Sequence, residues 1–114
     1  MQIKSAHEVE AKVVEMEGAS GTTMRLLIGP GDGAPNFNMR LFEIAPGGHT
    51  PLHSHPWEHE VYVLSGQGAV RTPAAEKAVS GTDCVFIPPG EQHQFANTGR
   101  QPLRFLCLVP RDSG

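Results

Sequence analysis

Four of the six histidines in this chain fall into two short segments whose spacing suits a metal site. His53, His55 and His59 lie within a single run, and His93 follows the proline-rich turn at residues 88–90. Imidazole is a preferred ligand of Zn, Cu, Fe and Ni, so these side chains could hold an ion that supplies Lewis acidity. The pattern predicts a metal centre, provided that the fold brings the two segments together.

Alternation along a strand decides which of these side chains can share a site. Residues i and i+2 of a strand point to the same face, so His53 and His55 can both face the inside of a barrel. His59 begins a strand-like run in which it shares a face with the apolar Val61 and Val63. If these valines face the core, His59 faces it with them, and the fourth histidine would come from a separate strand.

Short strand-like runs separated by glycine and proline dominate the chain. The 13 glycines and 10 prolines indicate many tight turns between short strands, because they show no collagen-like repeat. We predict a hairpin at residues 65–68, whose glycines can adopt positive φ, whereas residues 6–17 fit a helix and a strand equally well. The pattern predicts an all-β fold, either a closed barrel or a two-sheet jelly roll. The predicted strands are 22–28, 37–45, 59–64, 69–72, 83–87, 93–96 and 103–109.

The composition excludes several classes of protein. The chain has 114 residues and a net charge of −3 with no basic run, so nucleic-acid binding has no electrostatic support. No apolar stretch approaches the ~20 residues needed to span a membrane, and the first residues lack the apolar core of a signal peptide. Cys84 and Cys107 are not spaced as a disulfide framework or a CxxC motif. We therefore expect a cytoplasmic protein that binds neither nucleic acid nor membrane.

The first histidine segment resembles the first sequence motif of the cupin superfamily. That motif is a glycine, five residues, HXH, three or four residues, a glutamate, six residues and a second glycine. The chain matches it from Gly47 through His53 and His55 to Gly66, with His59 in the position of the glutamate.

The second histidine segment resembles the second cupin motif. Residues 88–90, His93 and Asn97 match its PXG, histidine and asparagine, while Gly81 stands one residue too far from Pro88, so we expect a small bulge or an altered turn there. The resemblance implies a single cupin domain over residues 1–114, folded as a jelly-roll β-barrel, with the motifs at 47–66 and 81–97.

The third metal ligand is the point at which the chain departs from the family pattern. Most cupins use a glutamate there, and this chain offers the neighbours His59 and Glu60. Only His59 keeps six residues before Gly66, and it also shares its face with apolar residues. We expect His59 to be the ligand, with Glu60 as the alternative.

This choice resembles that of small cupins whose manganese is held by four histidines. The resemblance implies one divalent ion per chain, Mn before Fe, Zn, Ni or Cu. Four neutral imidazoles leave the full +2 charge on the ion, whereas a carboxylate ligand would leave +1, so the site should favour anionic ligands. A tetrahedral Zn would be saturated by four imidazoles, whereas an octahedral ion keeps two open positions.

Three further side chains are expected around the metal, although each could also have an ordinary structural role. Arg40, in the strand before the first motif, could anchor a carboxylate. Phe95 lies two residues after His93 and would give the pocket an apolar wall. The resemblance to four-histidine cupins also places Cys107 at the pocket. Trp57 suits packing or a subunit interface better than a substrate platform.

The expected function is that of a metal-binding cupin with a small-molecule ligand, and its reaction class stays open. We expect a Mn- or Fe-dependent oxygenase of the dioxygenase type, because only His49 and Glu60 lie near the ligands as possible general bases. No catalytic residue can be assigned. The alternatives are an oxygen-independent lyase or isomerase acting on a sugar acid or other carboxylate, and a non-catalytic module that binds a small anion. A homodimer is expected, since small cupins are usually dimers and a short chain has a thin stability margin.

Overall fold

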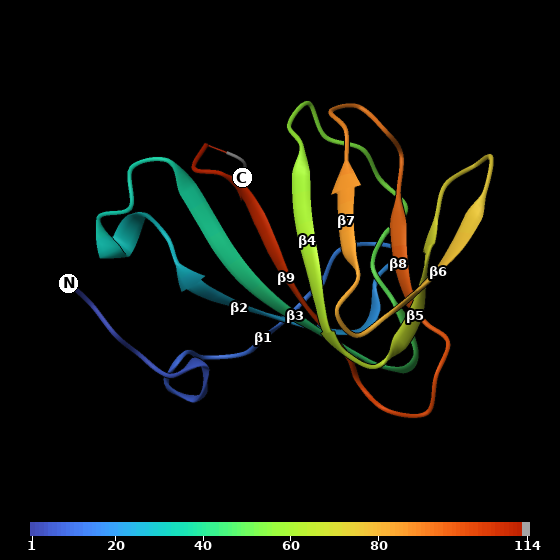
Figure 1. Ribbon diagram of the computed structural model, residues 1–114, viewed down its shortest axis with the longest axis horizontal. Helices are drawn as coiled ribbons and strands as arrows, with labels where there is room; N and C mark the ends of the chain where they lie inside the picture. Colours follow the sequence, from blue (N-terminus) through green and yellow to red (C-terminus); the bar gives the residue numbers. More distant parts are fainter. Residues whose placement is uncertain (113–114) are drawn as a thin grey trace.

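The computed structural model describes residues 1–112 as one curled antiparallel sheet, which forms the half-barrel of a jelly roll (Figure 1). The all-β prediction is therefore confirmed. Apart from two 3-10 turns, η1 (Ala6–Glu8) and η2 (Pro30–Asp32), the described residues contain no helix. No helix in this part of the chain is therefore long and apolar enough to cross a membrane. The strands are β1 (Lys12–Val13), β2 (Ser20–Ile28), β3 (Phe37–His49), β4 (His59–Ser65), β5 (Gln67–Arg71), β6 (Glu76–Ser80), β7 (Cys84–Ile87), β8 (Gln94–Asn97) and β9 (Leu103–Pro110).

The long strand β3 connects the two parts of the sheet. Along most of its length it pairs with β9 on one side and β2 on the other, and its last residue, His49, pairs with Ala96 of β8. The strand order is β6-β5-β8-β3-β9-β4-β7, with β2 and β1 added beside β3. Neighbours in this order are mostly distant in sequence, so side chains of separate segments meet inside the curl.

The prediction of a hairpin at residues 65–68 is wrong, because the strands on either side of this turn do not pair with each other. Strand β4 pairs with β7 and β9, whereas β5 pairs with β6 and β8, so the chain changes partners at this turn. Gly66 has a φ of 92°, and a Cβ at this position would lie 2.5 Å from the carbonyl oxygen of Pro102. A glycine is required there because the segment before β9 passes close to the turn, and not because two strands fold back on each other.

Three further features differ from what the sequence suggests. A hairpin lies between β5 and β6, and β6 was not predicted because its sequence is largely exposed and lacks a clear apolar alternation. Residues 46–48, whose proline and glycines favour a turn, instead continue β3, where Gly48 passes close to the backbone of Ser20. Residues 6–17 contain only the turn η1 and the two-residue strand β1. The altered turn expected after Gly81 is present, with a φ of 77° at Thr82.

The core lies on the concave side of the sheet. Burial alternates along β4 as predicted, with the side chains of His59, Val61 and Val63 buried and those between them exposed. Asn97, the asparagine of the second motif, is buried and holds the end of β8 in place. Its Nδ2 donates to the carbonyl oxygens of Ile44 and Gln101, each at 2.8 Å.

The convex face of β4, β7 and β9 carries exposed apolar side chains. Phe86 is 60% exposed and Tyr62 is 42% exposed, and they line a shallow hollow together with Leu106 and Leu108. Exposed apolar patches of this kind mark surfaces that bind another protein. The homodimer expected from the sequence stays a prediction, and we propose this convex face as its contact surface.

Replacing Phe86 with lysine should shift the protein from dimer to monomer, because the dimer would then have to bury a charge against apolar side chains. Light scattering coupled to size-exclusion chromatography measures the mass directly. The matched control is Val13→Lys, because Val13 lies on the separate strand β1 and its side chain is 66% exposed. This variant should keep the wild-type mass. A wild-type monomer, or an unchanged mass for Phe86→Lys, would contradict the prediction.

Candidate metal centre

The two histidine segments are joined by their backbones. The amide of His53 donates to the carbonyl oxygen of His93 at 3.1 Å, and the amide of His93 donates to that of His53 at 2.9 Å. The amide of Gly90 also donates to the carbonyl oxygen of His55 at 2.7 Å. These bonds set the loop before β4 beside the loop before β8, so that histidines distant in sequence face one cavity.

Three of the histidines form a cluster that could hold a metal ion. One ring nitrogen from each of His53, His55 and His93 lies within 4.8 Å of the others. The Nε2 atoms of His53 and His55 are 3.2 Å apart. For a metal–nitrogen bond of about 2.1 Å, two ligand nitrogens lie ~3.0 Å apart at a right angle and ~3.4 Å apart at the tetrahedral angle. The observed separation falls between these values.

His59 faces the same cluster from strand β4. Its ring centroid lies 5.1 Å from that of His55 and 4.9 Å from that of His93. The side chain is buried, and its Nε2 has no hydrogen-bond partner among the described residues. A buried polar nitrogen without a partner is costly, and a metal ion would satisfy it. Glu60 lies on the opposite, convex face of β4 and does not line the cavity.

The outer nitrogens of two imidazoles have partners that suit metal ligation. His93 Nδ1 lies 2.9 Å from the carbonyl oxygen of Glu91, and His59 Nδ1 lies 3.2 Å from the sulfur of Cys107. When Nδ1 carries the proton and donates it, the lone pair of Nε2 is left free to bind a metal. His55 is held instead by Trp57, whose ring stacks on it with a centroid distance of 4.6 Å and an interplanar angle of 4°.

The surroundings keep His53, His55 and His59 neutral, which is the form that binds metals. Burial, followed by the positive charge of neighbouring groups, lowers the pKa of His53 to about 4 and that of His59 to about 3. Burial and the charges of His93 and Arg40 also lower the pKa of His55. A metal ion would therefore meet little competition from protons at neutral pH.

The histidines form one wall of a cavity of about 370 Å³, within the size range of small-molecule sites. Arg40, Phe95 and Cys107, the three side chains predicted for the pocket, all line it. The ring of Phe105 stacks on Phe95 at 4.7 Å and on Phe42 at 5.3 Å, which gives the cavity a continuous aromatic wall.

Arg40 brings an unneutralised positive charge into this cavity. Its guanidinium lies 5.1 Å from the centroid of the Phe42 ring, and its Nη2 donates to Cys107 Sγ at 3.3 Å. Its Nε is buried without a partner among the described residues, and the residues that line the cavity include no aspartate or glutamate. The cavity therefore offers a cation that a bound anion could neutralise.

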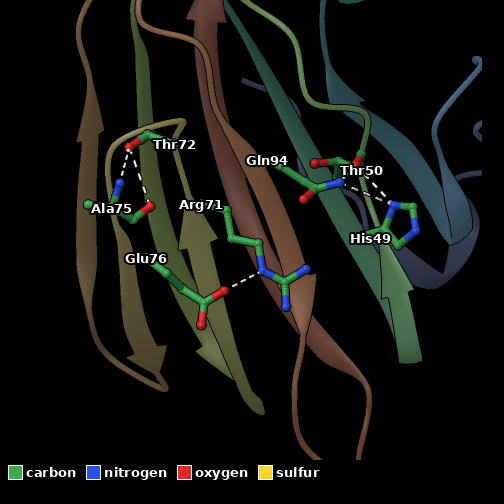
Figure 2. A network of polar contacts seen from close by, with 7 residues as sticks. All are labelled: His49, Thr50, Arg71, Thr72, Ala75, Glu76 and Gln94. Atoms are coloured by element: carbon green, nitrogen blue, oxygen red, sulfur yellow. Dashed lines mark hydrogen bonds and ion pairs between the residues drawn. The ribbon is translucent and has the colours of Figure 1, made fainter.

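His49, considered in the sequence as a possible base, is not among the residues that line the cavity and contacts Gln94 instead, as Figure 2 shows. Its Nδ1 is 3.4 Å from Gln94 Nε2, which also donates to the carbonyl oxygen of Thr50 at 3.0 Å. The ion pair of Arg71 and Glu76, drawn in the same figure, belongs to the neighbouring β5–β6 hairpin.

Several residues of the cavity were missed by the sequence analysis. Phe42 lies two residues after Arg40 on β3, so alternation along that strand could have placed it in the pocket. Trp57, expected to pack or to form an interface, lines the cavity and stacks on His55, and its Nε1 is buried without a partner among the described residues. No sequence pattern reveals this stacking, because the segment before β4 forms no regular strand.

Comparison with known proteins supports a shared fold and a shared family. Residues 40–109 match the family model described as cupin domain. The solved structure of the polyketide cyclase RemF from Streptomyces resistomycificus superposes with a TM-score of 0.93 and 39% identity, over 98% of this chain and 80% of that one.

Two curated relatives differ in how much of their length this chain matches. The oxalate-binding protein of Thermotoga maritima is 27% identical over 113 residues, which are 96% of this chain and 93% of the relative. The 1-methylthio-D-xylulose 5-phosphate methylsulfurylase of Rhodospirillum rubrum is 41% identical over 71 residues, which are 62% of this chain and 46% of the relative. The chain thus spans less than half of the methylsulfurylase.

The metal-free protein should lose stability as the pH falls from about 6.5 towards 4. In this range the unfolded chain protonates His53 and His59, whose pKa values are about 4 and 3 in the folded protein. The unfolded state then binds more protons, so the free energy of unfolding decreases with acidity, by at most about 1.4 kcal/mol per pH unit and histidine. Urea denaturation at several pH values measures the slope.

The variant His53→Gln removes one of these titrating groups and should give a shallower pH dependence than the wild type. Solvent screening reduces the effect of His53 because its side chain is only half-buried. A free energy of unfolding that is flat between pH 6.5 and 4.5 would contradict this account.

The third ligand can be tested with the neighbouring variants His59→Ala and Glu60→Ala. We expect His59→Ala to bind the metal at least about tenfold more weakly than the wild type. Losing only a residue that hydrogen-bonds to a metal ligand costs about 10- to 100-fold in affinity, and losing the ligand itself should cost no less. Glu60→Ala should keep wild-type affinity because this side chain faces away from the cavity. Elemental analysis and chelator competition give both values. Metal retained in His59→Ala and lost in Glu60→Ala would overturn the assignment.

Proposed function

Because this chain belongs to the cupin family, we propose that it is a metal-dependent enzyme acting on a small, enolisable, anionic organic substrate. The metal would be held by His53, His55, His59 and His93, with Mn expected before Fe, Zn, Ni or Cu. The leading reaction in our proposal is the ring closure of a linear poly-β-ketone chain. Oxygenation, the reaction expected from the sequence, is the second candidate.

The observation that carries this proposal is the composition of the cavity wall. Converging neutral imidazoles lie on one side, stacked phenylalanine rings on another, and the guanidinium of Arg40 between them has no carboxylate partner among the lining residues. The aromatic wall suits a flat, conjugated molecule, and the cationic groups suit the negative oxygen of an enolate or carboxylate.

The bound metal would act as a Lewis acid that polarises a carbonyl oxygen of the substrate. Arg40 would bind a second oxygen through its unpartnered Nε and so stabilise the negative charge of the enolate. The rings of Phe95 and Phe105 would hold the carbon chain and exclude water from it. In ring closure, the substrate would bind as an enolate that has already lost its proton to solvent. Its enolate carbon attacks a carbonyl carbon of the same chain, the new alkoxide takes a proton from water, and a molecule of water is then lost.

The likeness to the polyketide cyclase RemF supports ring closure, because it extends over nearly the whole chain at 39% identity. The second candidate, a dioxygenase, is favoured by one feature of the cavity. Its lining residues include no aspartate or glutamate to accept a proton. Oxygenation at the metal would not require a general base from the protein. A lyase, an isomerase and a non-catalytic anion-binding module remain outcomes of the test.

The proposal predicts that metal-loaded protein converts a linear 1,3,5-triketone under strict anaerobiosis to a cyclic product one water lighter. Mass spectrometry identifies the product, and an oxygen electrode records any uptake in air. Product only in air, with oxygen consumed, would replace the cyclase by the dioxygenase. An isomeric or fragmented product would indicate an isomerase or lyase, and tight binding of oxalate without turnover of any substrate would indicate a binding module.

In the same assay Arg40→Met should lower kcat/KM by roughly tenfold to hundredfold. A hydrogen bond to a charged group contributes about 1.5–3 kcal/mol, and each 1.4 kcal/mol is a factor of ten. The matched control is Arg100→Met, which removes an exposed arginine outside the cavity and should leave kcat/KM unchanged. Equal rates for Arg40→Met and the wild type would exclude Arg40 from substrate binding.

A further inference from the structure

Cys107 contacts two of the groups on which the cavity depends. Its sulfur lies 3.2 Å from His59 Nδ1 and accepts a hydrogen bond from Arg40 Nη2 at 3.3 Å. The residue is 2% exposed, so these contacts are screened little by water. Cys84, by contrast, is exposed on β7 and lines no part of the cavity.

The strand register explains why these three side chains meet. Strand β9 lies between β3 and β4, and Cys107 is paired with Arg40 on one side and with Val61 on the other. His59 precedes Val61 by two residues on β4 and therefore points to the same, concave face. A side chain at position 107 thus lies between the arginine and the imidazole.

The contact of His59 with sulfur has two possible directions, with different consequences for Nε2. If the thiol donated to Nδ1, the proton of the imidazole would sit on Nε2, a buried atom with no acceptor among the described residues. If Nδ1 donates to the sulfur, Nε2 keeps a free lone pair directed at the other histidines. The burial of Nε2 without an acceptor favours the second direction, and the bond from Arg40 is compatible with it because a thiol sulfur has two lone pairs.

We propose that Cys107 is a positioning residue whose sulfur accepts the Nδ1 proton of His59 and thereby presents the Nε2 lone pair of His59 to the metal. The inference rests on the proposed function insofar as that function assigns His59 to the ligand set. Cys107 does for His59 what the carbonyl oxygen of Glu91 does for His93. The same sulfur also orients Arg40, so one side chain aligns a metal ligand and the proposed substrate cation.

The imidazole tautomer provides a test that needs neither metal nor substrate. In the metal-free protein at neutral pH, long-range proton–nitrogen correlation spectra should show the His59 proton on Nδ1. In Cys107→Ala, where no acceptor faces Nδ1, the spectra should show the proton on Nε2 or a mixture of the two tautomers. A wild-type His59 with its proton on Nε2, or an unchanged Nδ1 tautomer in Cys107→Ala, would overturn the proposal.

Metal affinity provides the second readout. By chelator competition, Cys107→Ala should bind the metal about 10- to 100-fold more weakly, which is the usual cost of losing an outer partner of a ligand. Cys107→Ser keeps an acceptor at this position and should recover most of the affinity, whereas a purely structural role would be served no better by serine than by alanine. Cys84→Ser is the matched control and should bind as the wild type does.

The two proposals fail in distinguishable ways. If the wild type binds no metal, the proposed function fails, while the tautomer spectra of the metal-free protein still decide the role of Cys107. If the wild type binds metal and Cys107→Ala binds it equally well, the role of Cys107 is excluded and the proposed function stands. The visible spectrum of the cobalt-substituted protein should change in Cys107→Ala and return towards that of the wild type in Cys107→Ser.

Discussion

The reciprocal backbone hydrogen bonds between His53 and His93 are the constraint on which the site depends. Each histidine belongs to a loop, and a loop by itself would not hold an imidazole within a fraction of an ångström. The paired amides and carbonyls give both loops the geometry of a strand pair at this one point. The bond from Gly90 to His55 adds a third connection, so the cluster has the rigidity of the sheet without belonging to a regular strand.

The charges in the cavity depend on how deeply its side chains are buried. His53 and His59 stay neutral because burial penalises their protonated form, and the guanidinium of Arg40 strengthens the effect. The same cavity leaves nitrogens of His53, His59, Arg40 and Trp57 without partners among the described residues. Such groups are costly to bury, and folds retain them where a ligand completes their hydrogen bonds or coordination. The cavity thus combines neutral imidazole lone pairs that could bind a cation with unpartnered N–H groups that could bind an anion.

The ligand candidates and their shared face were predictable from the sequence, because alternation is a local property of a strand. His59 follows from its spacing to Val61 and Val63, and Phe95 from its spacing to His93. Arg40 was found from its place in the strand before the first motif, and it also lines the cavity. The contact of Cys107 with His59 was not predictable, since it depends on β9 lying between β3 and β4. The hairpin prediction failed for the same reason. The glycine of that turn serves a close approach to Pro102, which no local pattern reveals.

The pairing of β9 with both β3 and β4 also has a consequence for how the protein folds. Strands with such distant partners give the fold a high contact order, and closing long loops costs entropy before the contacts they bring can form. Strand β9 follows both β3 and β4 in the chain, so the contact between Cys107 and His59 cannot form until all three strands have been synthesised. A nascent chain that lacks β9 already contains His53, His55, His59 and His93, but not the sulfur that faces His59 Nδ1. The wall that contacts the outer nitrogen of His59 is therefore completed only after all four histidines have been made.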